Sequence, residues 1–171
     1  MIVEKHIKPL EPPDSIHLKA AEGWLELGNH IETNEELEKI SPQLRVHPDV
    51  LELRWQIYAK DGQWEPCVDI ARALTKLAPA RPHGWIHLAY SLHELKRTKE
   101  AWDVLIPVVD KFPKEYLMRY NLACYACQLE NLEEAWRWLE QAFDIGDSKQ
   151  LKLMALDDPD LEPLWANIGE I

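Results

Sequence analysis

The sequence predicts an all-α fold built from stacked pairs of helices. The first observation behind this prediction is a recurrence, because apolar and small residues repeat at a spacing of 34 residues along most of the chain. The second is the layout of each unit, which reads as two amphipathic helices joined by a short turn. Residues 116–142 show this layout best, with the turn at Glu130-Asn131. Repeats of this length are typical of solenoids, in which each helix pair buries its apolar face against the next.

Small residues recur at the positions where the two helices of a pair should cross. Only a small side chain fits at a close crossing, and larger apolar residues fill the space beside it. The column of small residues in the second helix contains Thr33, Cys67, Ala101 and Ala135. A second column falls in the turn that ends the first helix, and it contains Gly28, Gly62, Lys96 and Glu130.

Four units follow from these columns, at residues 14–47, 48–81, 82–115 and 116–147. The first unit is degenerate, because Thr33 stands in the small column and Arg45 stands where proline ends the second and third units. In the third unit, Pro107 predicts a kink or an early end of the second helix, since proline lacks the backbone donor that a helix interior needs.

The two ends of the chain lie outside the repeat. Residues 148–171 are expected to form capping helices that cover the apolar face of the last unit, because an uncovered terminal unit would expose that face to water. Prolines exclude a helix from residues 1–13, which therefore read as an extended arm. The arm either packs on the first unit or is mobile, and the apolar side chains available for packing are Ile2, Ile7 and Leu10.

The period and the columns together resemble the tetratricopeptide repeat (TPR) family over about four-fifths of the chain. The resemblance implies a right-handed α-α superhelix, or solenoid, of four TPR-type helix pairs with C-terminal capping helices, forming one domain over residues 14–171. The ending DPDLEPLW resembles the tails of bacterial members, so a bacterial source is expected. The shared property of the family is binding other proteins or peptides.

Composition narrows the classes of partner. The formal net charge is −11, which argues against nucleic acid and against an anionic membrane surface, since both select basic faces. No apolar run is long enough to span a bilayer, and the N-terminus lacks the apolar core of a signal peptide. With three cysteines and no export signal, a reduced cytoplasmic protein is expected.

The resemblance also implies that the first helix of each unit lines an inner, concave groove. An aromatic and amide-bearing patch in such a groove suits an extended peptide or a partner helix. We therefore expect a non-catalytic interaction scaffold that binds a protein or peptide. Its groove residues in the third and fourth units are His83, His87, Tyr90, His93, Glu94, Tyr120, Asn121, Cys124 and Gln128. The first two units contribute Leu18, Lys19, Glu22, Glu26, Asp49, Glu52, Leu53, Gln56 and Lys60.

Two alternative functions remain open at this stage. His83 and His87 are spaced to share a metal, and Cys124 and Cys127 form a C-x-x-C pair, although packing within a helix explains both cysteines. Self-assembly through the degenerate first unit or the arm is the other alternative, so the oligomeric state is undecided. No nucleophilic triad, phosphate loop or paired-acid cleft is visible, and neither catalysis nor a cofactor is expected.

Overall fold

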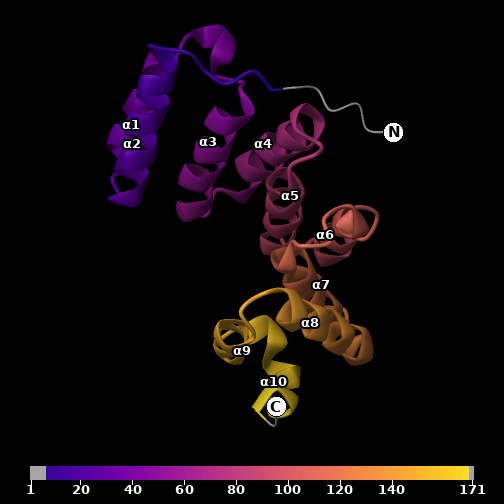
Figure 1. Ribbon diagram of the computed structural model, residues 1–171. Coiled ribbons are helices and arrows are strands. Elements are labelled where there is room, and N and C mark those ends of the chain that lie inside the picture. The colour runs from indigo at the N-terminus through magenta and orange to yellow at the C-terminus, as the bar shows by residue number, and fades with distance from the viewer. Residues whose placement is uncertain (1–6, 170–171) are drawn as a thin grey trace. The chain divides into compact units, whose positions relative to one another are not determined.

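The computed structural model describes residues 7–169, and over this range the protein contains ten α-helices, three 3-10 helices and no strand (Figure 1). The chain divides into two units, of which unit 1 ends at Ser91 and unit 2 begins at Leu92. Contacts are concentrated within each unit. The single domain expected over residues 14–171 therefore stays a prediction.

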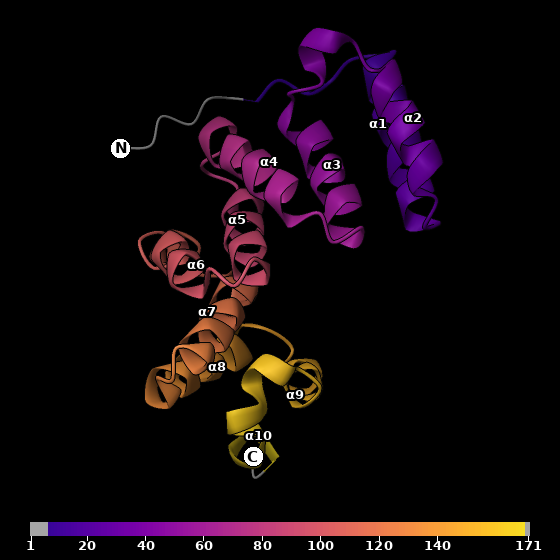
Figure 2. The ribbon, with the colours of Figure 1, turned by 180° about the vertical axis from the view of Figure 1, so that it is seen from behind.

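Unit 1 contains the first two helix pairs and most of a fifth helix. Figures 1 and 2 show α1 beside α2 and α3 beside α4 from opposite sides. Its elements are α1 (Asp14–Glu26), α2 (His30–Lys39), η1 (Pro42–Leu44), α3 (Pro48–Lys60), α4 (Trp64–Leu77) and α5 (Pro82–Glu94), the last of which ends in unit 2.

Unit 2 contains the remaining helices, with α7 packed against α8 and α9 packed against α8. Its further elements are α6 (Thr98–Leu105), η2 (Val109–Lys111), α7 (Tyr116–Gln128), α8 (Leu132–Ile145), α9 (Ser148–Leu156), η3 (Pro159–Leu164) and α10 (Trp165–Gly169). The helix α6 ends at Leu105, two residues before Pro107, which confirms the early end predicted from that proline.

The first helix of each pair begins at Asp14, Pro48, Pro82 or Tyr116, so the period of 34 residues is kept in the backbone. Proline favours the first turn of a helix, where its missing N–H has no partner to lose. Asn29 and Asn131 cap the second helices of the first and fourth pairs, and each side chain accepts a hydrogen bond from a backbone N–H of the first turn.

The turn inside each pair has the same backbone conformation in all four pairs. Its residues have positive φ angles of 74° at Gly28, 67° at Gly62, 63° at Lys96 and 63° at Glu130. This left-handed conformation suits glycine, and it is costly for residues that carry a Cβ atom. Lys96 and Glu130 therefore adopt it because the geometry of the pair requires it.

The small column is fully buried, as the helix-crossing argument predicts. Thr33, Cys67, Ala101 and Ala135 each have an exposed fraction of 0%. Thr33 satisfies its hydroxyl by donating to the carbonyl of Asn29 at 2.8 Å. A polar residue is therefore tolerated at the crossing of the degenerate first pair.

The described part of the arm packs on the first helix pair. Leu10 contacts the apolar core that Leu18, Leu37 and Ile40 help to form, whereas Ile2 lies outside the described residues. The buried carboxylate of Asp14 then closes the pair by accepting hydrogen bonds from the backbone N–H and hydroxyl of Ser41, at 2.6 and 3.1 Å.

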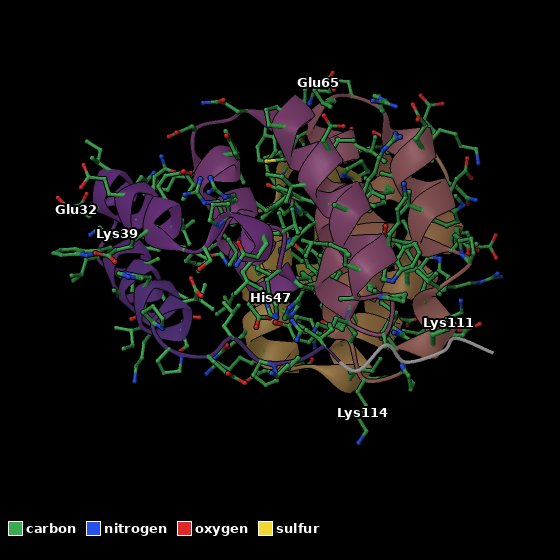
Figure 3. All side chains as sticks on the ribbon, turned by 90° about the horizontal axis from the view of Figure 1, so that it is seen from above. Glu32, Lys39, His47, Glu65, Lys111 and Lys114 are labelled. Atoms are coloured by element: carbon green, nitrogen blue, oxygen red, sulfur yellow. The ribbon has the colours of Figure 1, made fainter. Side chains whose placement is uncertain are left out.

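Charged side chains cover the outside of both units. Figure 3 shows Glu32 and Lys39 of unit 1, and Lys111 and Lys114 of unit 2, extending away from the ribbon. Within residues 7–169, no helix has the length and apolar character that a membrane span requires.

Candidate functional site

Trp55 anchors one face of unit 1 by joining α3 to α5. Its indole N–H donates to the hydroxyl of Ser91 at 3.0 Å, and that hydroxyl donates in turn to the carbonyl of His87 at 2.7 Å. The ring of His87 stacks on the indole with centroids 3.7 Å apart and planes 11° apart. Stacking on Trp55 and the hydrogen bond from Ser91 to its carbonyl therefore fix the position of His87.

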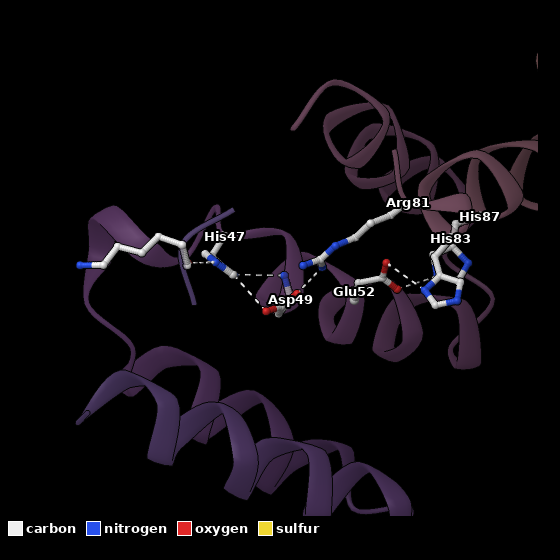
Figure 4. A network of polar contacts seen from close by, with 7 residues as sticks. His47, Asp49, Glu52, Arg81, His83 and His87 are labelled. Carbon is white, nitrogen blue, oxygen red and sulfur yellow. Dashed lines mark hydrogen bonds and ion pairs between the residues drawn. The ribbon is translucent and has the colours of Figure 1, made fainter. Parts of the chain in front are cut away.

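The carboxylate of Glu52 points toward two histidines of α5 (Figure 4). Its carboxylate oxygens lie 3.0 Å from Nε2 of His87 and 3.6 Å from Nδ1 of His83. Burial alone would raise the pKa of Glu52, but the hydrogen bonds from His83 and His87 outweigh it and lower that pKa to about 2. The side chain is only 17% exposed, so this face holds a half-buried carboxylate that stays ionised at neutral pH.

A hollow of about 380 Å³ opens beside Glu52 on the surface of unit 1. We call its lining the unit 1 face, which consists of Glu22, Leu25, Glu26, Asp49, Glu52, Leu53, Gln56, Arg81 and His83. Arg81 forms an ion pair with Asp49, and Nδ1 of His47 lies 3.6 Å from the same carboxylate (Figure 4). Four carboxylates against one guanidinium make the unit 1 face negative.

Tyr90 places an accessible aromatic ring one turn further along α5. It is 38% exposed and packs edge-on against Trp55 and Trp64, with ring centroids 6.4 and 5.6 Å away. An aromatic side chain supported from below and exposed above is a common contact for a protein partner.

In unit 2, the residues predicted for the groove are covered by the chain's own C-terminus. Tyr120 and Cys124 are each 4% exposed, His93 is 6% exposed and Asn121 is 8% exposed. Three of these contact the segment Asp158–Leu164, which we call the tail segment. Gln128 is exposed but also contacts it, and Glu94 is half-buried at the end of α5.

The predicted set is therefore divided between two places. His83, His87 and Tyr90 lie together in unit 1, with the carboxylate of Glu52 facing both histidines. The other predicted residues lie in unit 2, where the tail segment rather than open solvent faces most of them. The expectation of an open groove at Tyr120 and Cys124 is corrected accordingly, because helical periodicity indicates the direction of a side chain but not what covers it.

Comparison with known proteins rests on structure alone, because no protein-family model and no curated protein sequence matches this chain. A thermophilic TPR protein from Thermus thermophilus matches with a TM-score of 0.74 at 16% identity, covering 91% of this chain and 83% of that one. YrrB, described as a TPR protein with an unusual peptide-binding site, matches at 0.67 and 19% identity over 85% and 75% of the two chains.

MamA matches with a TM-score of 0.69 at 11% identity, covering 81% of each chain. The helix pairs, their turns and their spacing are thus shared with solved repeat proteins. This chain has the tetratricopeptide repeat fold. The class predicted from the sequence, an all-α solenoid of helix pairs, is confirmed.

Within this TPR fold, the repeat does not predict the roles of two residues of the site, Trp55 and Arg81. Trp55 shares its position in the repeat with Ala21, Ala89 and Ala123, which indicates packing, and it is 9% exposed. Nothing in the repeat indicates that it holds His87. Arg81 ends the second unit, outside the first helices that are expected to line the groove. An arginine 32 residues from Asp49 offers no local signal for their ion pair.

The structure gives the thiol alternative no chemical support. Burial raises the pKa of Cys124 well above its usual value, with Asp158 and Asp160 adding to the shift, and burial likewise raises the pKa of Cys127. A protonated thiol is a poor nucleophile and a poor metal ligand. Over the described range, no three histidine, cysteine or acidic side chains are grouped as a metal site would need.

Proposed function

We propose that this protein is a non-catalytic interaction module and that the unit 1 face binds a peptide segment carrying a basic side chain. The observation that carries the proposal is the hollow beside Glu52, which four carboxylates line. The exposed ring of Tyr90 lies on the same helix as His83, outside the lining of the hollow. The TPR fold is shared with YrrB, for which a peptide-binding site is described.

Charge supports a basic ligand. The low pKa of Glu52 keeps this carboxylate ionised at neutral pH, and Glu22 and Glu26 add two carboxylates across the hollow. A lysine or arginine of the ligand would form charge-assisted hydrogen bonds there. The net charge of −11 would also favour encounter with a basic partner.

Rigidity supports specific rather than diffuse binding. The ring of His87 is fixed by Trp55, and the carboxylate of Glu52 is fixed by His87 and His83, so a ligand would meet groups that are already in place. Preorganised groups lose less conformational entropy on binding than mobile ones. Tyr90 adds a contact surface at a low entropy cost.

Selection from a displayed peptide library tests the proposal directly. The intact protein should enrich peptides that contain lysine or arginine, and a chosen peptide should bind at least about tenfold more weakly to a Glu52→Gln/Tyr90→Ala variant. Glu65→Gln is the matched control, because it removes the same charge from an exposed position on α4 outside the hollow.

The control should bind the chosen peptide as the intact protein does, and all three proteins should have the same helical circular dichroism. Enrichment of peptides without basic residues would contradict the ligand class. Equal binding to the Glu52→Gln/Tyr90→Ala variant would exclude a site built on Glu52 and Tyr90.

Self-assembly through the first helix pair is a second candidate, favoured by exposed apolar side chains. Leu27 and Ile31 flank the α1–α2 turn and are 77% and 74% exposed. Exposed apolar clusters often mark interaction surfaces. Light scattering over a range of concentrations should then show a dimer that Leu27→Ser/Ile31→Ser converts to monomer. A monomer at every concentration would remove this candidate.

A further inference from the structure

The tail segment lies on α7, α8 and α9 of unit 2 and is bound through its side chains. The hydroxyl of Tyr120 donates to Oδ2 of Asp158 at 2.9 Å, and the thiol of Cys124 lies 3.7 Å from the same oxygen. Leu161 and Leu164 of the segment are 0% and 4% exposed. Carboxylate and leucine positions of the segment are thus both recognised.

The second carboxylate of the segment has its own partners. Nε2 of His93 lies 2.8 Å from Oδ2 of Asp160, and Nδ1 of the same ring lies 3.0 Å from the hydroxyl of Thr98, which orients it. The side-chain amide of Gln128 donates to the carbonyl of Asp160 at 3.2 Å. Donors from the end of α5 and from α7 therefore converge on one short stretch of chain.

The phenol of Tyr120 and the thiol of Cys124 keep their protons at neutral pH and so remain hydrogen-bond donors. Burial raises the pKa of Tyr120, and the neighbouring Cys124 and Asp158 raise it further, so the phenol keeps its proton. The thiol of Cys124 is protonated for the same reason. Neither group competes with Asp158 for negative charge, and both can hydrogen-bond to it.

The segment also has the form of a short linear ligand. Oδ1 of Asp158 accepts from the backbone N–H of Asp160 at 3.0 Å and so caps the short 3-10 helix that follows. The turn directs Asp160, Leu161 and Leu164 toward the protein, whereas the side chains between them are exposed. A simple cover for the last helix pair would need the leucines alone, not paired carboxylates with dedicated donors.

We propose that this surface of unit 2 is a second peptide-binding site, specific for an acidic-leucine motif Asp-x-Asp-Leu-x-x-Leu, which the tail segment occupies in cis. The occupant in trans is a protein segment that carries the same motif, and it binds when the tail segment is displaced. This site differs in chemistry from the unit 1 face, whose carboxylates would repel an acidic ligand.

The cis arrangement makes the site conditional. A ligand tethered by a short connection has an effective concentration on the order of millimolar, so a weak trans ligand cannot compete with it. Substitutions in the tail segment that weaken its binding to unit 2 should therefore expose a site that is otherwise covered. Substitutions in the residues that bind the segment, such as Tyr120, should weaken the site itself.

Fluorescence anisotropy with a labelled synthetic peptide covering residues 157–169 tests this proposal. The full-length Asp158→Ala/Leu161→Ala variant should bind the peptide at least about tenfold more tightly than the unmodified chain. A peptide in which Asp158 and Asp160 are replaced by asparagine and Leu161 by alanine should bind neither protein. Adding Tyr120→Phe to the tail variant should weaken binding of the first peptide by several fold.

Glu65→Gln added to the tail variant is the matched control, because it removes a charge from an exposed position of unit 1 and should leave this binding unchanged. The proposal is overturned if the tail variant keeps its helical circular dichroism but does not bind the peptide, or binds both peptides equally. Should the double variant fail to fold, Asp160→Asn carries the test, since it keeps the leucine packing and removes only the charge beside His93. Binding to Asp160→Asn no tighter than to the unmodified chain would also overturn the proposal.

Discussion

Gly84 lies in tight contact with α4, and replacing it should destabilise unit 1. A Cβ atom at this position would lie 2.9 Å from Cβ of Leu74 and 3.1 Å from both the carbonyl carbon of Leu74 and the backbone nitrogen of Thr75. Backbone atoms cannot move aside as the end of a side chain can. The Gly84→Ala variant must therefore separate the two helices slightly.

The magnitude follows from two opposing effects. Alanine favours a helix over glycine by about 1 kcal/mol, whereas overpacking a tight contact costs about 1–3 kcal/mol. Gly23 in α1 isolates the first effect, because no atom lies within 4 Å of a Cβ built there. Gly23→Ala should stabilise unit 1 by about 1 kcal/mol, and Gly84→Ala should fall below it by about 1–3 kcal/mol.

Urea denaturation followed by far-ultraviolet circular dichroism measures both variants, and equal slopes would show that the same surface is exposed on unfolding. The same clash should move His83 and His87 away from Glu52. Gly84→Ala should therefore also lower the affinity of the unit 1 face for its ligand. A Gly84→Ala variant as stable as Gly23→Ala would refute the close approach of α4 and α5.

Three further outcomes are expected. The pKa of Glu52 falls from 4.5 to about 2 on folding. The ionised carboxylate therefore adds about 3 kcal/mol to the free energy of unfolding, at 1.36 kcal/mol per unit, and this stability is present above pH 4.5 and lost as the pH falls toward 2. Acid denaturation of Glu52→Gln should lack this loss. Cys124 and Cys127 should react with a thiol reagent only after denaturation, and rapid labelling of the native protein would contradict their burial. Asn131→Ala removes the cap on the N–H of Glu134 and should cost about 1 kcal/mol in urea denaturation.

The periodic part of the fold could be predicted because it depends on local physics. Helix starts, turns and crossings recur with the repeat, and each leaves a residue preference that a single sequence displays. Ala101 and Ala135 illustrate this, since a crossing that excludes water also excludes a larger side chain. The helix from Trp64 to Leu77 follows the same rule through Cys67.

The candidate site could be predicted only in part, because much of it depends on contacts that have no period. His83, His87 and Tyr90 could be predicted from their direction on a helix. The partners that hold them in place, above all Trp55, lie far along the chain. The direction of Tyr120 could be predicted in the same way, but the segment that covers it belongs to the non-repeating C-terminus, where spacing carries no information about the surface it will contact.

The four left-handed turns have a consequence for how much variation the repeat can absorb. The backbone conformation at Lys96 and Glu130 matches that at Gly28 and Gly62. The turn that joins the two helices of a pair therefore keeps its shape whether or not its residue is glycine. Two of the four turns form this left-handed conformation without glycine. Replacing Lys96 or Glu130 by glycine should therefore stabilise the protein by about 1 kcal/mol each, because glycine adopts this conformation without strain.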